Sequence, residues 1–251
     1  MKMYVIPTEL ACNARCAFCI TKFRKTADTQ FLVLSDLSDA LKRFELEKIE
    51  ITGGGEPTLH PDISEVIERC SDKTRTQMYT HGANLEGSGN LNRLETLCVS
   101  MAHYDEGENR RIMGVNPEFH VLRSLSVPIK FSLLIHKSGI HTREELLKYL
   151  DKSVSLGFVR KVVVRQMFEQ DYQGRLNGEF VSSEKLFRQL GVPNVFSSTL
   201  TAQGNSVFDY QGLEVEVEYR SCACEMDNPV LHADGSIHRG WSEELYDFNG
   251  E

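Results

Sequence analysis

Three cysteines near the start of the chain have a spacing that favours metal binding. Cys12, Cys16 and Cys19 form a C-x3-C-x2-C pattern directly after a short apolar, strand-like run. Three thiolates this close in sequence can face one metal centre from a single loop, whereas a fully protein-ligated [4Fe–4S] cluster takes four. The stretch contains no fourth thiol. A cluster bound here would therefore keep one iron open to an external ligand, as catalytic zinc sites keep one position open.

A second motif, Gly-Gly-Gly-Glu-Pro at residues 53–57, follows another strand-like run. Glycines allow a ligand to approach the backbone closely, because no Cβ atom is in the way. The carboxylate of Glu56 beside them can accept hydrogen bonds from an ammonium group. The motif therefore predicts a binding site for a ligand that carries an amino group.

In this order, the two motifs resemble the radical S-adenosylmethionine (SAM) superfamily, nearest the branch of molybdenum-cofactor cyclases and peptide-modifying enzymes. The resemblance implies that Cys12, Cys16 and Cys19 ligate three irons of a [4Fe–4S] cluster and that SAM chelates the fourth. Reductive cleavage of SAM would then give a 5′-deoxyadenosyl radical, which abstracts hydrogen from a substrate. A cysteine triplet alone is also typical of zinc sites. The glycine motif in its expected place favours the cluster.

The resemblance also implies a SAM site at the ends of the strands. Gly54 and Gly55 would line its methionine end, Glu56 would contact its amino group, and Phe18 matches an aromatic position near adenine. Later positions match places where relatives contact ribose, carboxylate or substrate: Ser100, Ser132 and Arg165. For each of these three, the structural alternative is a polar group that is hydrogen-bonded within the fold.

Four residues are candidates for catalysis, namely His81, Arg165, Cys222 and Cys224. His81 stands where relatives often carry Asn, so a function carried over to this position is in doubt. In related enzymes a C-terminal extension binds a second iron–sulfur cluster, but two nearby thiols are too few for one. We therefore expect the segment around Cys222 and Cys224 to close the mouth of the barrel or to supply a hydrogen-donating thiol. Cys70 and Cys98 are predicted to be buried small apolar residues.

Composition limits the possible partners and compartment. The chain has 251 residues and a net charge of −8, which argues against binding nucleic-acid polymers or anionic membranes. Seven cysteines and no signal-peptide pattern predict a reducing, cytoplasmic location. The expected partners are a small-molecule substrate, a nucleotide among the candidates, or a short peptide, and an electron donor such as flavodoxin or ferredoxin. Two other hypotheses are an iron–sulfur electron carrier and a zinc-stabilised binding module.

Alternating apolar and amphipathic stretches predict an α/β fold with a parallel sheet. Helices are expected to begin at Ser35, at Pro61, at Asn116-Pro117 and at Thr142, where a capping box precedes a stop at Gly157. Strands are expected over residues 4–8, 48–52, 75–80, 96–100, 130–135 and 161–167. Six such repeats match the partial (β/α)6 TIM-like barrel that the resemblance implies.

Beyond about residue 167 the pattern changes, so we divide the chain into a core barrel (1–180) and a short α+β extension (181–251). The extension is expected to contain a short helix over 183–190 and two strands, over 206–210 and 213–219, joined by a turn at Gln211-Gly212. Alternation of apolar residues with glutamates in the second strand predicts one buried and one acidic face.

Overall fold

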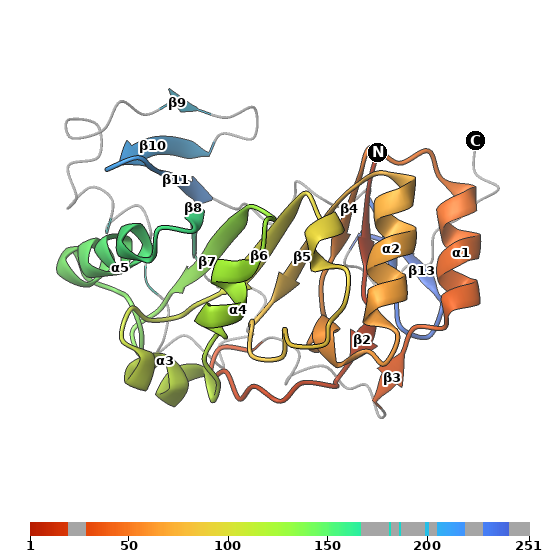
Figure 1. Ribbon diagram of the computed structural model, residues 1–251, viewed down its shortest axis with the longest axis horizontal. Coiled ribbons are helices and arrows are strands. Elements are labelled where there is room, and N and C mark those ends of the chain that lie inside the picture. Colours follow the sequence, from red (N-terminus) through yellow and green to blue (C-terminus); the bar gives the residue numbers. More distant parts are fainter. Residues whose placement is uncertain are drawn as a thin grey trace.

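One large sheet dominates the computed structural model, which describes residues 1–19, 29–166, 199–200, 205–218 and 228–240, with Val181 and Leu186 (Figure 1). Its strand order is β13-β12-β1-β4-β5-β6-β7-β8-β11-β10-β9. The strands are β1 (Lys2–Val5), β4 (Lys48–Ile51), β5 (Arg75–Thr80), β6 (Thr96–Ser100), β7 (Ile129–Ile135), β8 (Val159–Gln166), β9 (Thr199–Leu200), β10 (Ser206–Tyr210), β11 (Leu213–Glu218), β12 (Pro229–Leu231) and β13 (Ile237–Arg239). A separate antiparallel pair, β2 (Thr8–Glu9) and β3 (Gln30–Phe31), lies beside it.

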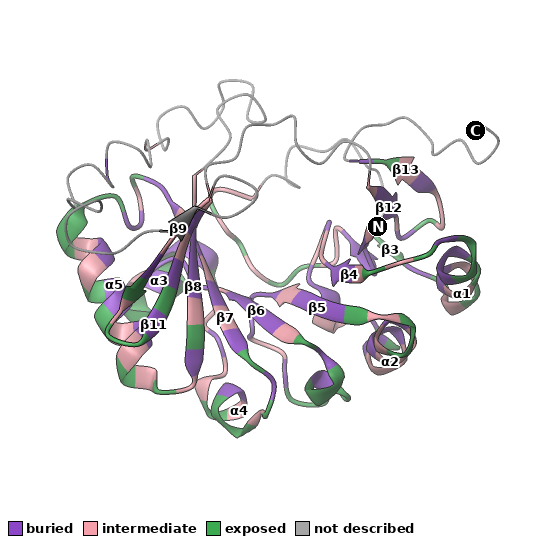
Figure 2. Ribbon diagram, turned by 90° about the horizontal axis from the view of Figure 1, so that it is seen from above, coloured by how far each residue is buried: buried purple, intermediate pink, exposed green. Residues whose placement is uncertain are grey.

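The core of the sheet is parallel from β12 through β1 to β11, and it curves with helices on its outer side (Figure 2). The helices are α1 (Leu34–Arg43), α2 (Ile63–Lys73), α3 (Glu106–Met113), α4 (Phe119–Ser124) and α5 (Arg143–Leu156). Short 3₁₀ turns cover Pro57–Leu59 and Leu91–Arg93. In the described residues the sheet does not close, so the architecture is the predicted partial barrel.

Side-chain alternation gives the sheet an apolar outer face and a polar inner face. The outer face carries buried residues that pack in one core with the helices, among them Met3, Val5, Ile49, Ile51, Met78, Leu97, Val99, Phe131, Leu133, Val162 and Val164. The intervening positions carry Glu50, Gln77, Tyr79, Lys130 and Arg165. The apolar stripe holds the helices, which leaves the inner face available for chemistry.

Most helix termini follow local signals, but three helices differ from the prediction, among them α4, which begins at Phe119 rather than at Asn116-Pro117. Thr142 and Glu145 form the expected capping box at α5, and Gly157 ends the helix with a φ of 74°. The helix α2 starts at Ile63 rather than at Pro61, because His60 and Asp62 form a turn first. The sequence reading missed α3, which begins after Asp105, whose carboxylate accepts a hydrogen bond from the Glu108 N–H.

The strands beyond residue 181 join both edges of the same sheet. On one side β11 pairs in parallel with β8 and antiparallel with β10, with the turn at Gln211-Gly212 as predicted. On the other side β12 pairs with β1 and with β13. The predicted alternation in β11 is confirmed, since Leu213, Val215 and Val217 are buried. The helix expected over 183–190 lies outside the described residues except for Leu186.

Candidate active site

The three cysteines lie on an extended loop at the carboxyl end of β1. Cys12 is exposed, whereas Cys16 and Cys19 are half-buried. Two backbone hydrogen bonds fix the middle of this loop to the end of α3, from Arg15 N to Met113 O (2.6 Å) and from Ala17 N to Ile112 O (3.4 Å). The missed helix α3 is therefore the support of the cysteine loop.

The donor set of this loop fits an iron–sulfur cluster by its chemistry. Three thiols project from one short, anchored segment, and thiolates are the ligands that such clusters take. Within the described residues, no group of three or more His, Cys, Asp or Glu side chains has the geometry of a finished metal site. The assignment of Cys12, Cys16 and Cys19 as ligands therefore stays a prediction that rests on residue type and spacing.

The glycine motif packs directly against the root of the cysteine loop. A Cβ atom on Gly55 would lie 2.3 Å from the Ala11 carbonyl oxygen, and one on Gly54 would lie 3.1 Å from Glu9 Oε1. The Leu10 N–H donates to the Gly54 carbonyl (3.3 Å), and the Glu56 N–H donates to Ala11 O (2.7 Å). The absence of side chains at Gly54 and Gly55 thus allows two loops to touch through their backbones.

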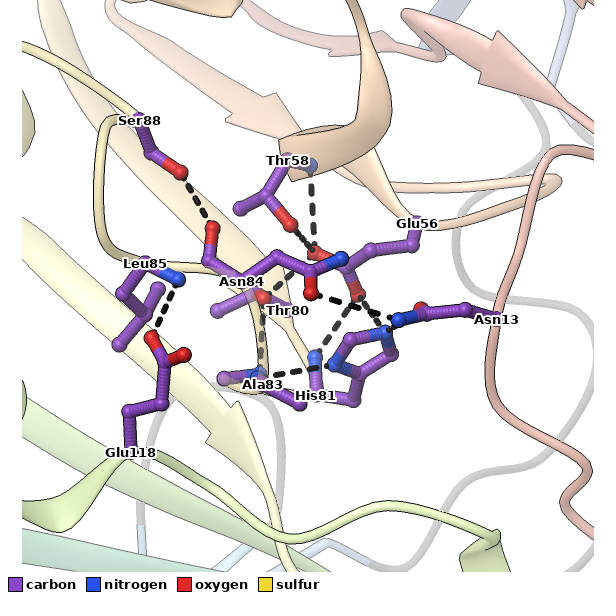
Figure 3. A network of polar contacts seen from close by, with 11 residues as sticks. Asn13, Glu56, Thr58, Thr80, His81, Ala83, Asn84, Leu85, Ser88 and Glu118 are labelled. Atoms are coloured by element: carbon purple, nitrogen blue, oxygen red, sulfur yellow. Dashed lines mark hydrogen bonds and ion pairs between the residues drawn. The ribbon is translucent and has the colours of Figure 1, made fainter.

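Glu56 is the centre of a buried hydrogen-bond network (Figure 3). Its Oε1 accepts from the N–H and the hydroxyl of Thr58 (3.2 and 2.8 Å) and from the Thr80 hydroxyl (2.5 Å). Its Oε2 accepts from the His81 N–H (2.9 Å). Oε1 is fully engaged. Among the described residues, Oε2 accepts this one hydrogen bond and has the His81 ring nitrogen Nε2 at 3.4 Å, which leaves it capacity for another donor.

His81 connects the Glu56 network to the cysteine loop. Its Nδ1 accepts a hydrogen bond from the Ala83 N–H (3.0 Å), so in the neutral ring the proton is on Nε2. That nitrogen lies 2.7 Å from Asn13 Oδ1 and 3.4 Å from Glu56 Oε2. Asn13, between the first two cysteines, also donates to Asn84 Oδ1 (3.3 Å). His81 thus bridges the carboxylate and the loop, a position that the sequence reading did not foresee.

Phe18 belongs to the cysteine loop, between Cys16 and Cys19. Its ring packs 4.8 Å from the ring of buried His136, centroid to centroid, and against Ala102, Ile112 and Met113. The residue as a whole is half-buried. This is consistent with the expected aromatic position, although the adenine contact itself stays a prediction.

The remaining sequence candidates lie on the inner face of the sheet. Ser100 and Ser132 are register partners on β6 and β7, and both are half-buried. Arg165 on β8 forms a two-bond ion pair with Glu218 on β11 (2.8 and 3.2 Å) and donates to the Tyr79 hydroxyl (3.2 Å). Burial acts to lower the pKa of Arg165, but Tyr79 and Glu218 outweigh it and raise this pKa above its ordinary value. Arg165 is therefore a fixed cation rather than a proton donor.

The remaining cysteines lie away from the cysteine loop or outside the described residues, and Tyr79 was not singled out from the sequence. Cys222 and Cys224 lie outside the described residues. Cys70 and Cys98 are buried as expected, but Cys98 is on the polar inner face, where its Sγ lies 4.0 Å from Gln77 Oε1. The sequence reading overlooked Tyr79, although strand alternation places it on the same face as Gln77.

Comparisons with known proteins agree with this architecture. No profile of a protein family matches the chain. The chain is 26% identical over 161 residues to a probable GTP 3′,8-cyclase of Saccharolobus islandicus, a match that covers 58% of this chain and 51% of the relative. It is 25% identical over 251 residues to the GTP 3′,8-cyclase of Haemophilus ducreyi, covering 90% and 73%. A third relative is an S-adenosylmethionine-dependent nucleotide dehydratase of Flammeovirga pacifica, 31% identical over 113 residues, covering 39% and 38%.

Solved structures show the same fold. SuiB of Streptococcus suis bound to its precursor peptide SuiA superposes with a TM-score of 0.71 at 16% identity, covering 94% of this chain and 58% of SuiB. SuiB bound to S-adenosylmethionine gives a TM-score of 0.68 at 15% identity, covering 94% and 59%. The chain thus spans about half the length of the first curated relatives and somewhat more of SuiB. The sequence relatives, the fold and the two motifs thus agree with the resemblance of this chain to the radical SAM superfamily.

Proposed function

We propose that this protein is a radical SAM enzyme that acts on a small molecule, with nucleotides as the favoured class. Cys12, Cys16 and Cys19 would hold a [4Fe–4S] cluster. When bound, this cluster supplies the electron that cleaves SAM and generates the radical that abstracts hydrogen. The observation that carries the proposal is the backbone contact between the cysteine loop and the Gly-Gly-Glu-Pro turn at Ala11.

The chain's own residues would bind and orient SAM between these two loops. Glu56 Oε2 has capacity for one further hydrogen bond, which suits the amino group of SAM. The glycines bring the Glu56 turn close to the loop, and Phe18 within that loop would offer an aromatic surface to the ligand. Ser100 and Ser132 would contact the ligand from the sheet, and Arg165 would contact ligand or substrate from further along it.

The names of the relatives favour a nucleotide as the substrate, since the relatives include two GTP cyclases and a nucleotide dehydratase. Peptide modification is the second candidate, because SuiB, which has the same fold, was crystallised with a precursor peptide.

A reduced electron donor such as flavodoxin or ferredoxin would supply the electron. In the part of the chain that the structure describes, every helix is too short or too polar to span a bilayer.

The ligand assignment is tested by iron content. After anaerobic reconstitution, Cys16→Ala is expected to lose most of the iron and sulfide that the parent protein binds, because one of three thiolate ligands is gone. Cys70→Ala is the matched control, since Cys70 is buried in the core on α2 and should leave iron content unchanged. Full cluster loading of Cys16→Ala would refute the assignment.

The function of Glu56 is tested by SAM affinity. Glu56→Gln is expected to weaken SAM binding at least tenfold, measured by equilibrium dialysis, because an amide removes the charge that favours the amino group. Glu118→Gln is the control. Glu118 also accepts two backbone N–H groups, from Leu85 and Glu86, but has no contact with the cysteine loop among the described residues. Equal SAM affinity in Glu56→Gln and the parent protein would remove Glu56 from the site.

A further inference from the structure

Charges on the inner face of the sheet are almost completely paired within the described residues. Each cation there has a carboxylate within 4 Å, with one exception. The pairs are Lys2–Glu50 (3.8 Å), Lys48–Glu50 (3.1 Å), Arg75–Glu95 (3.6 Å), Lys161–Glu214 (2.7 Å), Lys161–Glu216 (2.6 Å) and Arg165–Glu218 (2.8 Å). Pairing of this kind is how a protein carries charges on a partly buried surface, because an isolated buried charge is costly.

Lys130 on β7 is the exception. It is half-buried, its register partners are Cys98 and Lys161, and no carboxylate of the described residues forms an ion pair with it. Its ammonium lies 5.5 Å from the centre of the Tyr79 ring, a cation–π contact. The thiol of Cys98 is its other neighbour. Neither neighbour carries a negative charge at neutral pH, because burial raises the pKa values of both Cys98 and Tyr79.

Tyr79 offers a hydrogen-bond donor at the same place. Its hydroxyl oxygen accepts from Gln77 Nε2 (3.0 Å) and from an Arg165 nitrogen (3.2 Å). Arg165 also lies over the ring, with its Cζ 5.2 Å from the centroid. The ring is therefore held from two sides, while the hydroxyl hydrogen has no acceptor among the described residues. An ammonium that forms no ion pair among the described residues thus lies 5.5 Å from the centre of a ring whose O–H donor is also unused there.

We propose that Lys130 and the Tyr79 hydroxyl bind an anionic group of the substrate, a phosphate or a carboxylate. The inference rests on the proposed function, because it places the substrate over the inner face of the sheet. A bound anion would satisfy both groups at once through charge-assisted hydrogen bonds. Arg165 would contribute less to binding of the anion, because its charge is already neutralised by Glu218. Lys130 is thus a residue that determines specificity for a negatively charged substrate in a protein whose net charge is −8.

The test uses the reconstituted full-length protein and two probes, inorganic pyrophosphate and malonate, with binding measured by isothermal titration calorimetry. We expect saturable binding of one probe, which identifies the anion as phosphate or carboxylate. Lys130→Met keeps the aliphatic stem and should weaken that binding at least tenfold. Lys130→Arg keeps the charge and should stay within about threefold of the parent protein. Lys42→Met, at an exposed pair with Asp39 on α1, is the control and should bind as the parent does.

Iron content, SAM affinity and melting temperature of the same samples separate the possible failures. If the parent protein binds neither probe, or if Lys130→Met binds as tightly as the parent, the inference about Lys130 is wrong, whatever the SAM results. If Lys130→Met loses anion binding together with folding, the Tyr79→Phe variant decides instead, and unchanged anion affinity in it overturns the proposal. If the parent protein does not bind SAM, the proposed function is wrong, whereas the measured anion binding remains valid.

Discussion

At the scale of single residues, the five described cysteines fall into two groups of different reactivity. Cys12, Cys16 and Cys19 lie on an exposed or half-exposed loop, whereas Cys70 and Cys98 are buried. Burial raises the pKa of the Cys70 thiol to about 12 from an ordinary value of 9.0. Because the thiolate is the reactive form, a three-unit shift lowers the reactive fraction about a thousandfold at neutral pH.

This difference predicts the pattern of alkylation. In the metal-free protein at pH 8, iodoacetamide should modify the three loop cysteines at least a hundredfold faster than Cys70, as measured by peptide mass spectrometry over time. Unfolding in guanidinium is the control and should equalise the rates. Rapid modification of Cys70 in the folded protein would contradict the placement of this thiol in the core.

The Arg165–Glu218 pair makes a prediction about stability. Both side chains are mostly buried, 18% and 13% exposed, so Arg165→Met removes the cation that faces this buried carboxylate. We expect a loss of about 3 kcal/mol in the free energy of unfolding, measured by urea denaturation. The double variant Arg165→Met/Glu218→Leu should recover most of it. A loss below about 1 kcal/mol in the single variant would show that water, rather than Arg165, solvates Glu218.

At the scale of elements, the contact between the glycine turn and the cysteine loop leaves no room for a side chain. A Cβ on Gly55 would lie 2.3 Å from Ala11 O, whereas a Cβ on Gly87 would meet nothing within 4 Å. Gly55→Ala should therefore push the two loops apart and lower iron loading at least severalfold. Gly87→Ala should load iron normally, although its φ of +80° costs some stability. Normal iron loading of Gly55→Ala would show that the contact does not position the cysteines.

The capping box of α5 gives a prediction with a defined pH dependence. Burial acts to raise the pKa of Glu145, but hydrogen bonds from His141 and Thr142 outweigh it and lower this pKa. Because the pKa of Glu145 is lowered in the folded protein, the stabilisation by its carboxylate is fully present above the ordinary pKa of a glutamate. It is lost as the pH falls through the lowered pKa. Thr142→Ala should therefore cost about 1 kcal/mol at pH 7, and the difference from the parent should shrink below about pH 4. A difference that is independent of pH would contradict a contribution from the Glu145 carboxylate.

Elements with a strong local signal were predictable from the sequence, and those that depend on tertiary contacts were not. Strands β5 and β6 match their predicted bounds. Three apolar residues in a row, Leu97 to Val99, mark β6, and β5 ends where the turn residues His81-Gly82 begin. The helix α3 was missed, because its residues are mainly charged and only Ile112 and Met113 face a core. The link from His81 to Asn13 joins positions 68 residues apart, so no local pattern could reveal it.

At the scale of the whole molecule, one sheet serves two purposes. Its outer face packs against helices to form the core, and its inner face carries the polar groups of β4 to β8 and β11. The cysteine loop and the Glu56 network lie at the carboxyl ends of the first strands, where barrels of this kind place their chemistry. Strands from the C-terminal part of the chain extend both edges. The candidate site and the polar inner face therefore belong to one continuous scaffold.

The central claim is that this scaffold cleaves SAM reductively. The most direct test is to reconstitute the protein anaerobically with iron and sulfide, reduce it with dithionite, add SAM and measure 5′-deoxyadenosine by liquid chromatography and mass spectrometry. We predict that the parent protein forms 5′-deoxyadenosine and that Cys16→Ala forms none. A fully loaded, reducible cluster that binds SAM but yields no 5′-deoxyadenosine, with or without nucleotide added, would contradict the account.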